Sequence, residues 1–324
     1  MVYKIEGFTL WNIKKLRKKI VMEKSEFYQK LCQILSQEQI LCQEPMSRHT
    51  TFRTGGPADY FVMPRIEQAA QVIALCQTEN MPCQIIGNGS NLLAADKGVR
   101  GVVLAFAKQA AQIQVNGNRI TAGAGALLSQ TAMAACQAGL AGMEFAAGIP
   151  GSAGGAVVMN AGAYGGEIKD ILTRVKVLNQ EGQILTMECG ELDLSYRHSC
   201  IPERKLTVLE AEFTLQPGLQ EEIRARMDEL RRRRTEKQPL DYPSAGSTFK
   251  RPEGNFAGKL IMEAGLAGFA TGGARVSEKH CGFVINSGNA SSADILELIR
   301  QVQHRVQQCS GIKLEMEVKC IGEF

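Results

Sequence analysis

The chain has 324 residues, of which 44% are hydrophobic and 22% charged, the balance of an ordinary soluble protein, and its length favours two or three domains. The formal net charge is +4, but residues 1–21 contain six Lys or Arg and one Glu, so the rest of the chain carries −1. A near-neutral body lacks the electrostatic footprint of a nucleic-acid-binding protein, and the run from Arg231 to Arg234 is too short to supply one. We interpret that run as a solvated helix face.

Cysteine and histidine spacing indicates neither a disulfide framework nor a metal site. The ten cysteines are scattered, and the nearest two, Cys76 and Cys83, stand seven positions apart, so we expect reduced thiols. The four histidines show no H-x-x-x-H spacing, and no metal is predicted. The sequence shows no secretory signal pattern and no apolar run suited to a membrane span, and we expect a cytoplasmic protein.

Residues 1–22 are predicted to form a basic arm that is either disordered or an extra helix, with Met22 as an alternative start. The arm could bind a membrane surface or a partner protein, but an extension without effect on activity is the favoured interpretation. From Glu23 onwards the pattern becomes that of a helix, with apolar residues at Phe27, Leu31, Ile34 and Leu35.

From Tyr60 onwards the sequence alternates between helical and strand patterns, as α/β proteins do. We expect a helix over residues 66–79, a strand over 83–86 that runs into Gly87-Asn-Gly-Ser-Asn91, and a strand over 102–106. A hairpin around Asn116-Gly117 and a helix over about 127–136 follow.

The segment 146–166 carries seven glycines, a density suited to backbone that approaches a ligand and poor for a regular core element. After it come a second hairpin, with strands over 174–178 and 183–187 around Glu181-Gly182, and a strand over 206–215.

Pro217-Gly218 is the clearest domain boundary in the sequence. A long helix begins there, and we expect one side of it to carry Leu219, Ile223, Met227 and Leu230. The last helix, over about 292–309, begins with the capping signal Ser291 to Asp294 and stops before Gly311. A final strand over 313–321 is predicted to place Leu314, Met316, Val318 and Cys320 on one side and Lys313, Glu315, Glu317 and Lys319 on the other.

Two glycine-rich loops suggest a phosphate-containing ligand. Adjacent amides in Gly87-Asn-Gly-Ser-Asn91 can form a nest for a pyrophosphate, although a tight strand-to-loop turn explains this pattern alone about equally well. It is no Rossmann fingerprint, because Leu92 stands where glycine is needed. The run Gly148-Ile-Pro-Gly-Ser-Ala-Gly-Gly155, with Asn160-Ala-Gly-Ala-Tyr-Gly165, is more specific, since so much flexible backbone is costly to order without a ligand.

Together with Thr54-Gly-Gly56, these loops resemble the FAD domain of the vanillyl-alcohol-oxidase type, in which two α/β lobes enclose the flavin. Four further motifs resemble the UDP-N-acetylenolpyruvoylglucosamine reductase family, in its second type, which lacks an extra tyrosine-bearing loop. They are Leu194-Ser-Tyr-Arg-His-Ser199, Ser244-Ala-Gly-Ser-Thr-Phe-Lys-Arg-Pro252, Val276-Ser-Glu-Lys-His280 and Leu314-Glu-Met-Glu-Val-Lys-Cys-Ile-Gly322. The resemblance runs from about His49 to the C-terminus.

This resemblance implies non-covalent FAD, NADPH as co-substrate, and conversion of UDP-N-acetylglucosamine enolpyruvate to UDP-N-acetylmuramate in peptidoglycan precursor synthesis, hence a role in cell wall biogenesis and division. Hydride would pass from NADPH to FAD, and from flavin N5 to the enolpyruvyl methylene carbon. We expect small-molecule partners only, no nucleic acid, and a monomer or weak dimer. The alternatives are another FAD oxidoreductase of the same superfamily and, in a different class, an interaction protein that uses the basic arm.

The same resemblance implies three catalytic residues. Arg197 would stabilise the enolate through its carboxylate, since a guanidinium fork binds a carboxylate bidentately. Ser247 would donate the proton to carbon. Glu317 would hydrogen-bond to the developing enol and must then be protonated. Glu315 has an equal claim by periodicity, and only the family pattern favours Glu317.

Substrate contacts are predicted for Tyr196, Lys237 and Lys250, whereas none is carried over to Arg251, because some members of the family have Asn there. Cofactor contacts are predicted for Thr54, Gly55, Gly56, Gly87, Asn88, Gly89, Ser90, Asn91, Leu92, Gly148, Ile149, Pro150, Gly151, Ser152, Gly154, Gly155, Ala161 and Gly162.

The predicted fold class is α+β, with a two-lobed vanillyl-alcohol-oxidase-type FAD-binding domain and a smaller C-terminal α+β substrate domain. The predicted divisions are the arm at 1–22, the FAD-binding domain at 23–217 with its core over about 53–217, the substrate-binding domain at 218–312, and the terminal strand at 313–324.

Overall fold

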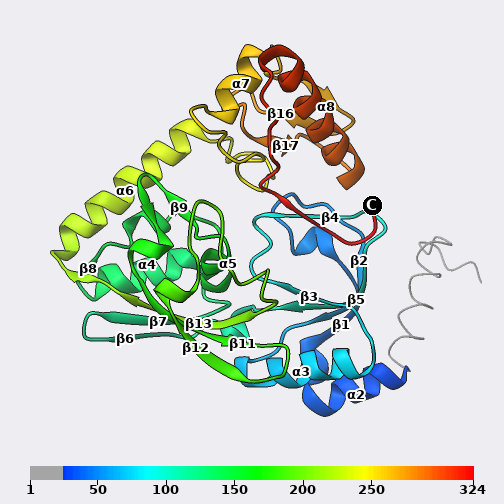
Figure 1. Ribbon diagram of the computed structural model, residues 1–324, viewed down its shortest axis with the longest axis vertical. Coiled ribbons are helices and arrows are strands. Elements are labelled where there is room, and N and C mark those ends of the chain that lie inside the picture. The colour runs from blue at the N-terminus through cyan, green and yellow to red at the C-terminus, as the bar shows by residue number, and fades with distance from the viewer. Residues whose placement is uncertain (1–24) are drawn as a thin grey trace, which may run out of the picture.

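The computed structural model describes residues 25–324, so the basic arm, Met22 and the predicted helix start at Glu23 lie outside the described residues. The described chain folds into two lobes and a C-terminal domain, which stands above both lobes in Figure 1. The α+β fold class is confirmed: helices and strands are mixed in all three parts.

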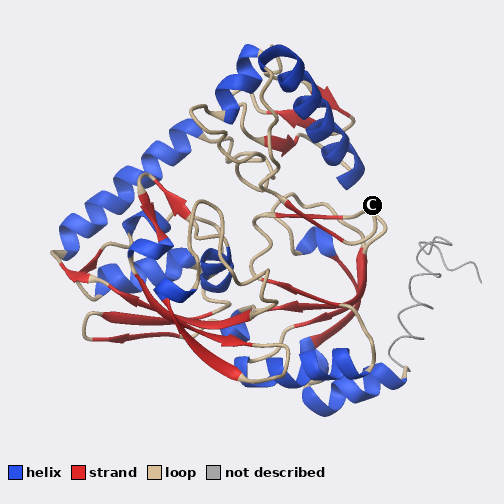
Figure 2. Ribbon diagram, in the orientation of Figure 1, coloured by secondary structure: helices blue, strands red, loops and turns tan. Residues whose placement is uncertain are grey.

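The first lobe is built on a four-stranded sheet in the order β1-β2-β5-β3. The strands are β1 (Ile40–Pro45), β2 (Pro57–Val62), β3 (Cys83–Ile86) and β5 (Val99–Ala105). β2 and β3 run parallel to β5, whereas β1 is antiparallel to β2. Helices α2 (Glu26–Ile34) and α3 (Ile66–Thr78) cover one face (Figure 2), with Phe27 and Leu31 of α2 packed into the core they share with the sheet.

The second lobe is an antiparallel sheet in the order β12-β11-β13-β7-β6. Its elements are β6 (Ile113–Asn116), β7 (Arg119–Gly123), β11 (Leu172–Leu178), β12 (Ile184–Glu188), β13 (Thr207–Thr214), α4 (Leu128–Gln137) and α5 (Ala153–Val158). Two short pairs join β8 (Leu140–Ala141) to β14 (Gln216–Pro217), and β9 (Gly162–Ala163) to β10 (Gly166–Glu167). Both predicted hairpins are present, as the β6–β7 and β11–β12 pairs.

Helix α5 corrects one expectation. The glycine-rich segment was predicted to be poor for a regular core element, yet α5 forms within it, and its Ala153, Ala156 and Val157 are buried. The glycines explain the packing, because a Cβ on Gly154 would lie 2.9 Å from the Cβ of Ala124. Small residues thus let this helix lie directly against the sheet.

Helix α6 (Gln220–Lys237) runs along the second lobe towards the C-terminal domain (Figure 1). Ile223 and Met227 pack in the second lobe's core. Leu219, predicted on the same buried side, is instead the residue before the helix and is 67% exposed. The division at residues 217–218 stays a prediction, and the first turns of α6 belong physically to the second lobe.

The C-terminal domain packs α7 (Ala257–Glu263) and α8 (Ser292–Ser310) around a small sheet of β15 (Ala270–Thr271), β16 (Ala274–Val276) and β17 (Val284–Asn286). The predicted capping signal of the last helix is confirmed: Ser291 accepts a hydrogen bond from the amide of Asp294, whose carboxylate bonds back to the amide of Ser291. Gly311 ends the helix in the left-handed conformation, as expected.

The predicted strand over 313–321 is regular only at its end, in β18 (Lys319–Ile321), which runs parallel to β4 (Leu92–Ala94) of the first lobe. The predicted alternation holds for the buried Leu314 and Val318 but fails at Cys320, which is exposed, while Ile321 is buried. The reason is a change of partner. Leu314 and Val318 pack in the C-terminal domain's core, and Ile321 packs in the first lobe's core.

Among residues 25–324, no helix has the length and apolar character to cross a bilayer. In the same part of the chain, no cluster of three His, Cys, Asp or Glu side chains could hold a metal ion. All ten cysteines fall within the described residues and are free thiols, as predicted.

Candidate active site

The structure brings the two predicted glycine-rich loops together. The side-chain amide of Asn88 donates a hydrogen bond to the carbonyl of Pro150, with a nitrogen-to-oxygen distance of 2.6 Å. A Cβ on Gly87 would lie only 2.2 Å from the hydroxyl of Ser152. The loop after β3 and the loop before α5, 60 residues apart in the chain, therefore form one surface that only glycine permits at this point.

A third segment, 49–54, wraps the first of these loops. The amide of Thr51 donates to the carbonyl of Gly89 at 3.2 Å. Gly89 has a φ of +64°, and a Cβ there would lie 1.9 Å from the carbonyl oxygen of His49. Both the backbone conformation and the contact require glycine, so the peptide groups of the loop stay free of side-chain cover.

Three buried hydroxyl oxygens around these loops lack a hydrogen-bond partner: those of Ser152, Thr51 and Thr54. Ser152 is 2% exposed and Thr54 is 4% exposed. Leaving such groups unpaired costs about 1–3 kcal/mol each, so native sites supply them with a polar partner. A ligand rich in phosphate and hydroxyl oxygens fits this surface, as FAD would, and the loops expose the backbone amides that a pyrophosphate prefers.

Other predicted cofactor glycines are explained by packing. Gly55 and Gly56 press against the backbone of Ala94 and Asp96, where a Cβ on Gly56 would lie 2.0 Å from the carbonyl oxygen of Asp96. Gly162 lies against Gly166 and Glu167 in the same way. Leu92 is the first residue of β4. Their contacts with a cofactor, and those of the remaining predicted positions, stay predictions.

Arg234 is a residue that sequence reasoning misplaced on a solvated face. It donates a hydrogen bond to the carbonyl of Gly148 in the second loop, and its side chain covers Gly148. Burial lowers the pKa of Arg234 from its ordinary value. The signal was present, because position 234 continues the buried stripe of Ile223, Met227 and Leu230 at helical spacing.

The structure joins two of the three predicted catalytic residues directly. The Nε of Arg197 lies 2.7 Å from Oε1 of Glu317, and the two side chains are 20% and 12% exposed. Arg197 stands in a tight turn closed by mutual backbone hydrogen bonds between Ser195 and His198. Its φ of 56° is strained for a residue with a side chain, and such strain concentrates at functional sites.

A buried amide anchors that turn. Asn160 is fully buried and donates hydrogen bonds to the carbonyl of Ser195 at 3.0 Å and to the carboxylate of Glu167 at 2.6 Å. Its own side-chain oxygen accepts from the amide of Lys169. Asn160 thereby fixes the turn that carries Arg197 against the segment that follows α5.

Burial raises the pKa of the Glu317 carboxyl, and this effect outweighs the opposing influence of Arg197, Lys250 and Lys319. The carboxyl is thus surrounded by cations but removed from water. Periodicity places Glu315 and Glu317 on one side of the terminal strand, yet Glu317 is 12% exposed, whereas Glu315 is 69% exposed and pairs with Lys250.

Thr248 links the third predicted residue, Ser247, to this pair. Thr248 is fully buried, and its carbonyl accepts a hydrogen bond from the amide of Glu317 at 2.8 Å. Its own amide donates to Gly282, and its hydroxyl accepts from the amide of Val284. Ser247, the residue before Thr248, is itself exposed. Sequence reasoning missed Thr248 because its role depends on contacts with residues more than 30 positions away.

The three predicted substrate contacts lie around this centre in different states. The hydroxyl of Tyr196 accepts a hydrogen bond from the amide of Arg251 at 3.1 Å, which bridges the second lobe and the C-terminal domain. Lys250 pairs with Glu315 at 2.5 Å. Lys237 is exposed at the last turn of α6. Their contacts with substrate stay predictions.

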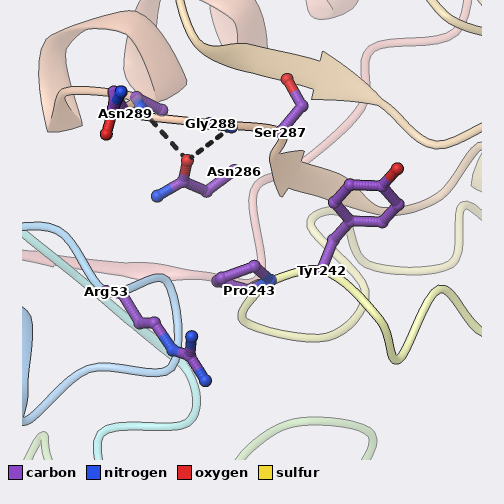
Figure 3. A pocket seen from close by; sticks show the side chains of 8 residues that line it. Arg53, Tyr242, Pro243, Asn286, Ser287, Gly288 and Asn289 are labelled. Atoms are coloured by element: carbon purple, nitrogen blue, oxygen red, sulfur yellow. Dashed lines mark hydrogen bonds between the residues drawn. The ribbon is translucent and has the colours of Figure 1, made fainter.

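A cavity of about 630 Å³ lies elsewhere, between the first lobe and the C-terminal domain. It is lined by Arg53, Tyr242, Pro243, Asn286, Ser287, Gly288, Asn289 and Ala290, none of which is a predicted site residue. Figure 3 shows the Asn286 side chain turned back on its own loop, where it accepts hydrogen bonds from the amides of Gly288 and Ala290. The side-chain oxygen of Asn286 is thus already engaged within its own loop.

Comparison with known protein families agrees with this geometry. Residues 58–188 match the model of an FAD binding domain. Residues 238–321 match the model of the UDP-N-acetylenolpyruvoylglucosamine reductase C-terminal domain. The first match covers parts of both lobes, and the second contains Ser247 and Glu317.

Individual relatives are similar over nearly their whole length. The UDP-N-acetylenolpyruvoylglucosamine reductase of Agathobacter rectalis is 54% identical, with 92% of this chain and 99% of the relative covered. That of Clostridioides difficile is 50% identical, with 93% and 100% covered. The crystal structure of UDP-N-acetylenolpyruvylglucosamine reductase from Thermus caldophilus superposes with a TM-score of 0.75 at 36% identity, covering 87% of this chain and 98% of that one.

Proposed function

The chain belongs to the UDP-N-acetylenolpyruvoylglucosamine reductase family, and we propose that Arg197, Ser247 and Glu317 carry the chemistry of its reaction. It is an FAD oxidoreductase of peptidoglycan precursor synthesis, with NADPH as co-substrate. One observation supports the residue assignment above the others. Glu317 is bonded to Arg197 of the second lobe, to Thr248 of the C-terminal domain and to Asn91 of the first lobe.

Bound FAD supplies the redox chemistry, taking reducing equivalents from NADPH and passing them to the enolpyruvyl double bond. The residues that would hold it are those of the 87–91 and 148–155 loops, with the hydroxyls of Ser152, Thr51 and Thr54 as hydrogen-bond partners. Arg234 supports the second loop by donating a hydrogen bond to the carbonyl of Gly148.

Arg197 has the chemistry to bind the substrate carboxylate. When reducing equivalents reach the methylene carbon, negative charge develops on the adjacent carbon and its carboxylate, and a fixed guanidinium stabilises that charge in a water-poor site. Its Nε is bonded to Glu317 and its Nη2 lies 3.4 Å from the carbonyl of Gly162, which orients the guanidinium plane. Lys250 and Lys319 add positive field at the same place.

Glu317 acts as a hydrogen-bond donor to the developing enol, a role that requires the protonated acid. Burial raises its pKa, which favours that form. Ser247 then donates the proton to carbon from the turn next to Thr248. A hydroxyl is a weak acid, but an enolate is a strong enough base to take its proton when the geometry is fixed.

Further parts of the proposal concern the cell. Ten free cysteines support a reducing compartment, and we propose the cytoplasm. A monomer or weak dimer and an exclusive use of small-molecule partners belong to the same proposal.

The test follows the flavin absorption band of the purified protein without oxygen. We expect NADPH to bleach the band and UDP-N-acetylglucosamine enolpyruvate to restore it. In the Ser247→Ala variant, bleaching should proceed at the normal rate, while restoration slows by about two powers of ten or more, the size of a lost general acid. Ser310→Ala, at the far end of α8, is the matched control. Equal slowing of both steps in Ser247→Ala would remove Ser247 from the proposed role.

A further inference from the structure

One short segment connects the flavin loop, the catalytic strand and the C-terminal domain. It begins with the glycine-rich loop at Gly87, continues as β4, and ends at Asp96. β4 pairs with β18, two residues after Glu317, and the carboxylate of Asp96 accepts hydrogen bonds from the first amides of α8. The loop is therefore joined to the terminal strand through the three paired residues of β4.

Asn91 stands at the junction of the loop and β4. Its side-chain amide donates a hydrogen bond to the backbone carbonyl of Glu317 at 3.2 Å. Its own backbone carbonyl accepts from the amide of Lys319 at 3.0 Å. Asn91 therefore contacts the chain on both sides of Val318, through its side chain at Glu317 and through its backbone at Lys319.

The other restraints on Glu317 come from different parts of the molecule. Its amide bonds to Thr248 and its carboxyl to Arg197, whereas its carbonyl has Asn91 as partner. Of these restraints, only Asn91 belongs to a loop that is predicted to hold the cofactor. Asn91 thus links this loop directly to the backbone of Glu317.

We propose that Asn91 is a positioning residue for Glu317, which couples occupancy of the flavin loop to placement of the catalytic carboxyl. This inference rests on the proposed function and adds a role for Asn91 other than the cofactor contact predicted for it. When a ligand orders the loop, the hydrogen bond from Asn91 fixes the backbone carbonyl of Glu317. The fixed backbone then holds the side-chain carboxyl of Glu317 in place. A displacement of about 1 Å at such a position can lower a rate by about a hundredfold.

The test uses Asn91→Asp, which keeps the shape of the side chain but cannot donate to the Glu317 carbonyl. Three quantities are measured: FAD affinity, the rates of flavin bleaching by NADPH and restoration by substrate at saturating FAD, and hydrogen exchange at the amides of Glu317 and Lys319 with and without FAD. Asn179→Asp, the same exchange in the exposed β11–β12 hairpin, is the matched control. The wild-type half-reactions test the proposed function separately.

At saturating FAD, we expect Asn91→Asp to bleach at the normal rate and to be restored at least about tenfold more slowly, while the new negative charge beside the proposed pyrophosphate site lowers FAD affinity. In the wild type, FAD should slow exchange at Lys319, and this protection should be lost in the variant. Asn91→Gln, which keeps an amide donor on a longer chain, should regain part of the restoration rate.

Two outcomes overturn the proposal. If FAD affinity falls while both half-reactions are normal at saturating FAD, Asn91 is a simple cofactor contact. If restoration rate and exchange at Lys319 match those of Asn179→Asp, the hydrogen bond to Glu317 has no role in positioning. Should Asn91→Asp fail to fold, Asn91→Ser, which is too short to reach the carbonyl, supports or overturns the proposal by the same measurements.

Discussion

Glu317 illustrates how one residue can be made an acid by its surroundings. A carboxylate beside an arginine ordinarily ionises more readily, but here removal from water opposes the ion pair and raises the pKa. Burying such a pair brings little stability, because desolvation offsets the attraction between the charges. The proposed function gives the pair a reason: the arginine would bind a substrate carboxylate, and the acid would donate a hydrogen bond.

A pH prediction follows for the same residue. The protonated form of Glu317 dominates below its raised pKa and is lost as pH rises through it. The rate of flavin restoration by substrate should therefore fall with rising pH, with a midpoint above the ordinary carboxyl range. In Glu317→Gln, whose amide is a permanent donor without a titrating proton, this fall in rate with rising pH should disappear. The absolute rate should drop, because Arg197 then has a neutral amide oxygen as its partner in place of a carboxylate. Stopped-flow measurement of the restoration rate between about pH 4 and pH 9 covers both the protonated and the ionised form of the carboxyl.

Glu315→Gln is the control for this prediction. It removes a carboxylate from the same strand, but that carboxylate is exposed and pairs with Lys250. The fall in rate with rising pH should persist in this variant. If the restoration rate still falls with rising pH in Glu317→Gln, or no longer falls in Glu315→Gln, the titration belongs to another group.

At the scale of elements, the flavin loops are shaped by three segments packed so closely that side chains are excluded between them. Gly89 is the most constrained of their glycines, because both its left-handed backbone and the carbonyl of His49 forbid a Cβ. A side chain at position 89 would therefore displace both the loop and the segment packed against it.

Gly89→Ala should consequently lose FAD. A left-handed alanine costs about 1–3 kcal/mol, and the displaced carbonyl of His49 moves the 49–54 segment off the loop. We expect purified protein without the yellow colour of the wild type, and a lower melting temperature in thermal denaturation. Gly190→Ala, where no atom lies within 4 Å of the added Cβ, should keep both properties. Full retention of FAD by Gly89→Ala contradicts this account of the loop.

Sequence pattern predicted most elements because their cause is local. The helix of α3, the strand β3 and the capping of α8 follow from apolar spacing and from Ser291 and Asp294 alone. The errors share a different cause. Cys320 and Ile321 exchange sides because the terminal strand leaves one core for another, and α5 forms because small residues fit against the second lobe.

The candidate site shows the same difference between features with a local cause and features that depend on distant residues. Motifs in the sequence identified Arg197 and Glu317, and the structure joins them. Thr248 and the link from Asn91 to Glu317 could not be predicted from spacing, since each depends on a partner between about 60 and 230 residues away. Spacing indicates that Arg234 lies on the buried side of α6, but not that it bonds to Gly148. The family resemblance predicts which residues react, and the tertiary contacts show which groups hold those residues in place.

At the scale of the whole molecule, the C-terminal domain is fixed to the first lobe at three places. The first place is the pairing of β18 with β4. The second is Phe52, whose carbonyl accepts from the side-chain amide of Asn286 and whose ring packs into the C-terminal core. The third place is the N-terminus of α8, where the carboxylate oxygens of Asp96 accept from the amides of Ser292 and Ala293, both at 2.9 Å. The reacting residues lie between these attachments and the second lobe.

The Asp96 attachment can be tested alone, because a carboxylate at a helix N-terminus satisfies amides that have no partner within the helix. Asp96→Ala should destabilise this contact by about 1 kcal/mol, the usual size of a lost cap, and Asp96→Asn by less, since one oxygen remains. Hydrogen exchange at Ser292 and Ala293 should quicken by roughly fivefold in Asp96→Ala. Glu191→Ala, which removes a carboxylate bonded to the amide of Glu188 in the second lobe, should leave α8 unchanged. Because Ser291 and Asp294 cap the same helix from within, unaltered exchange in Asp96→Ala would mean that α8 is closed by its own residues and that Asp96 adds nothing to its stability.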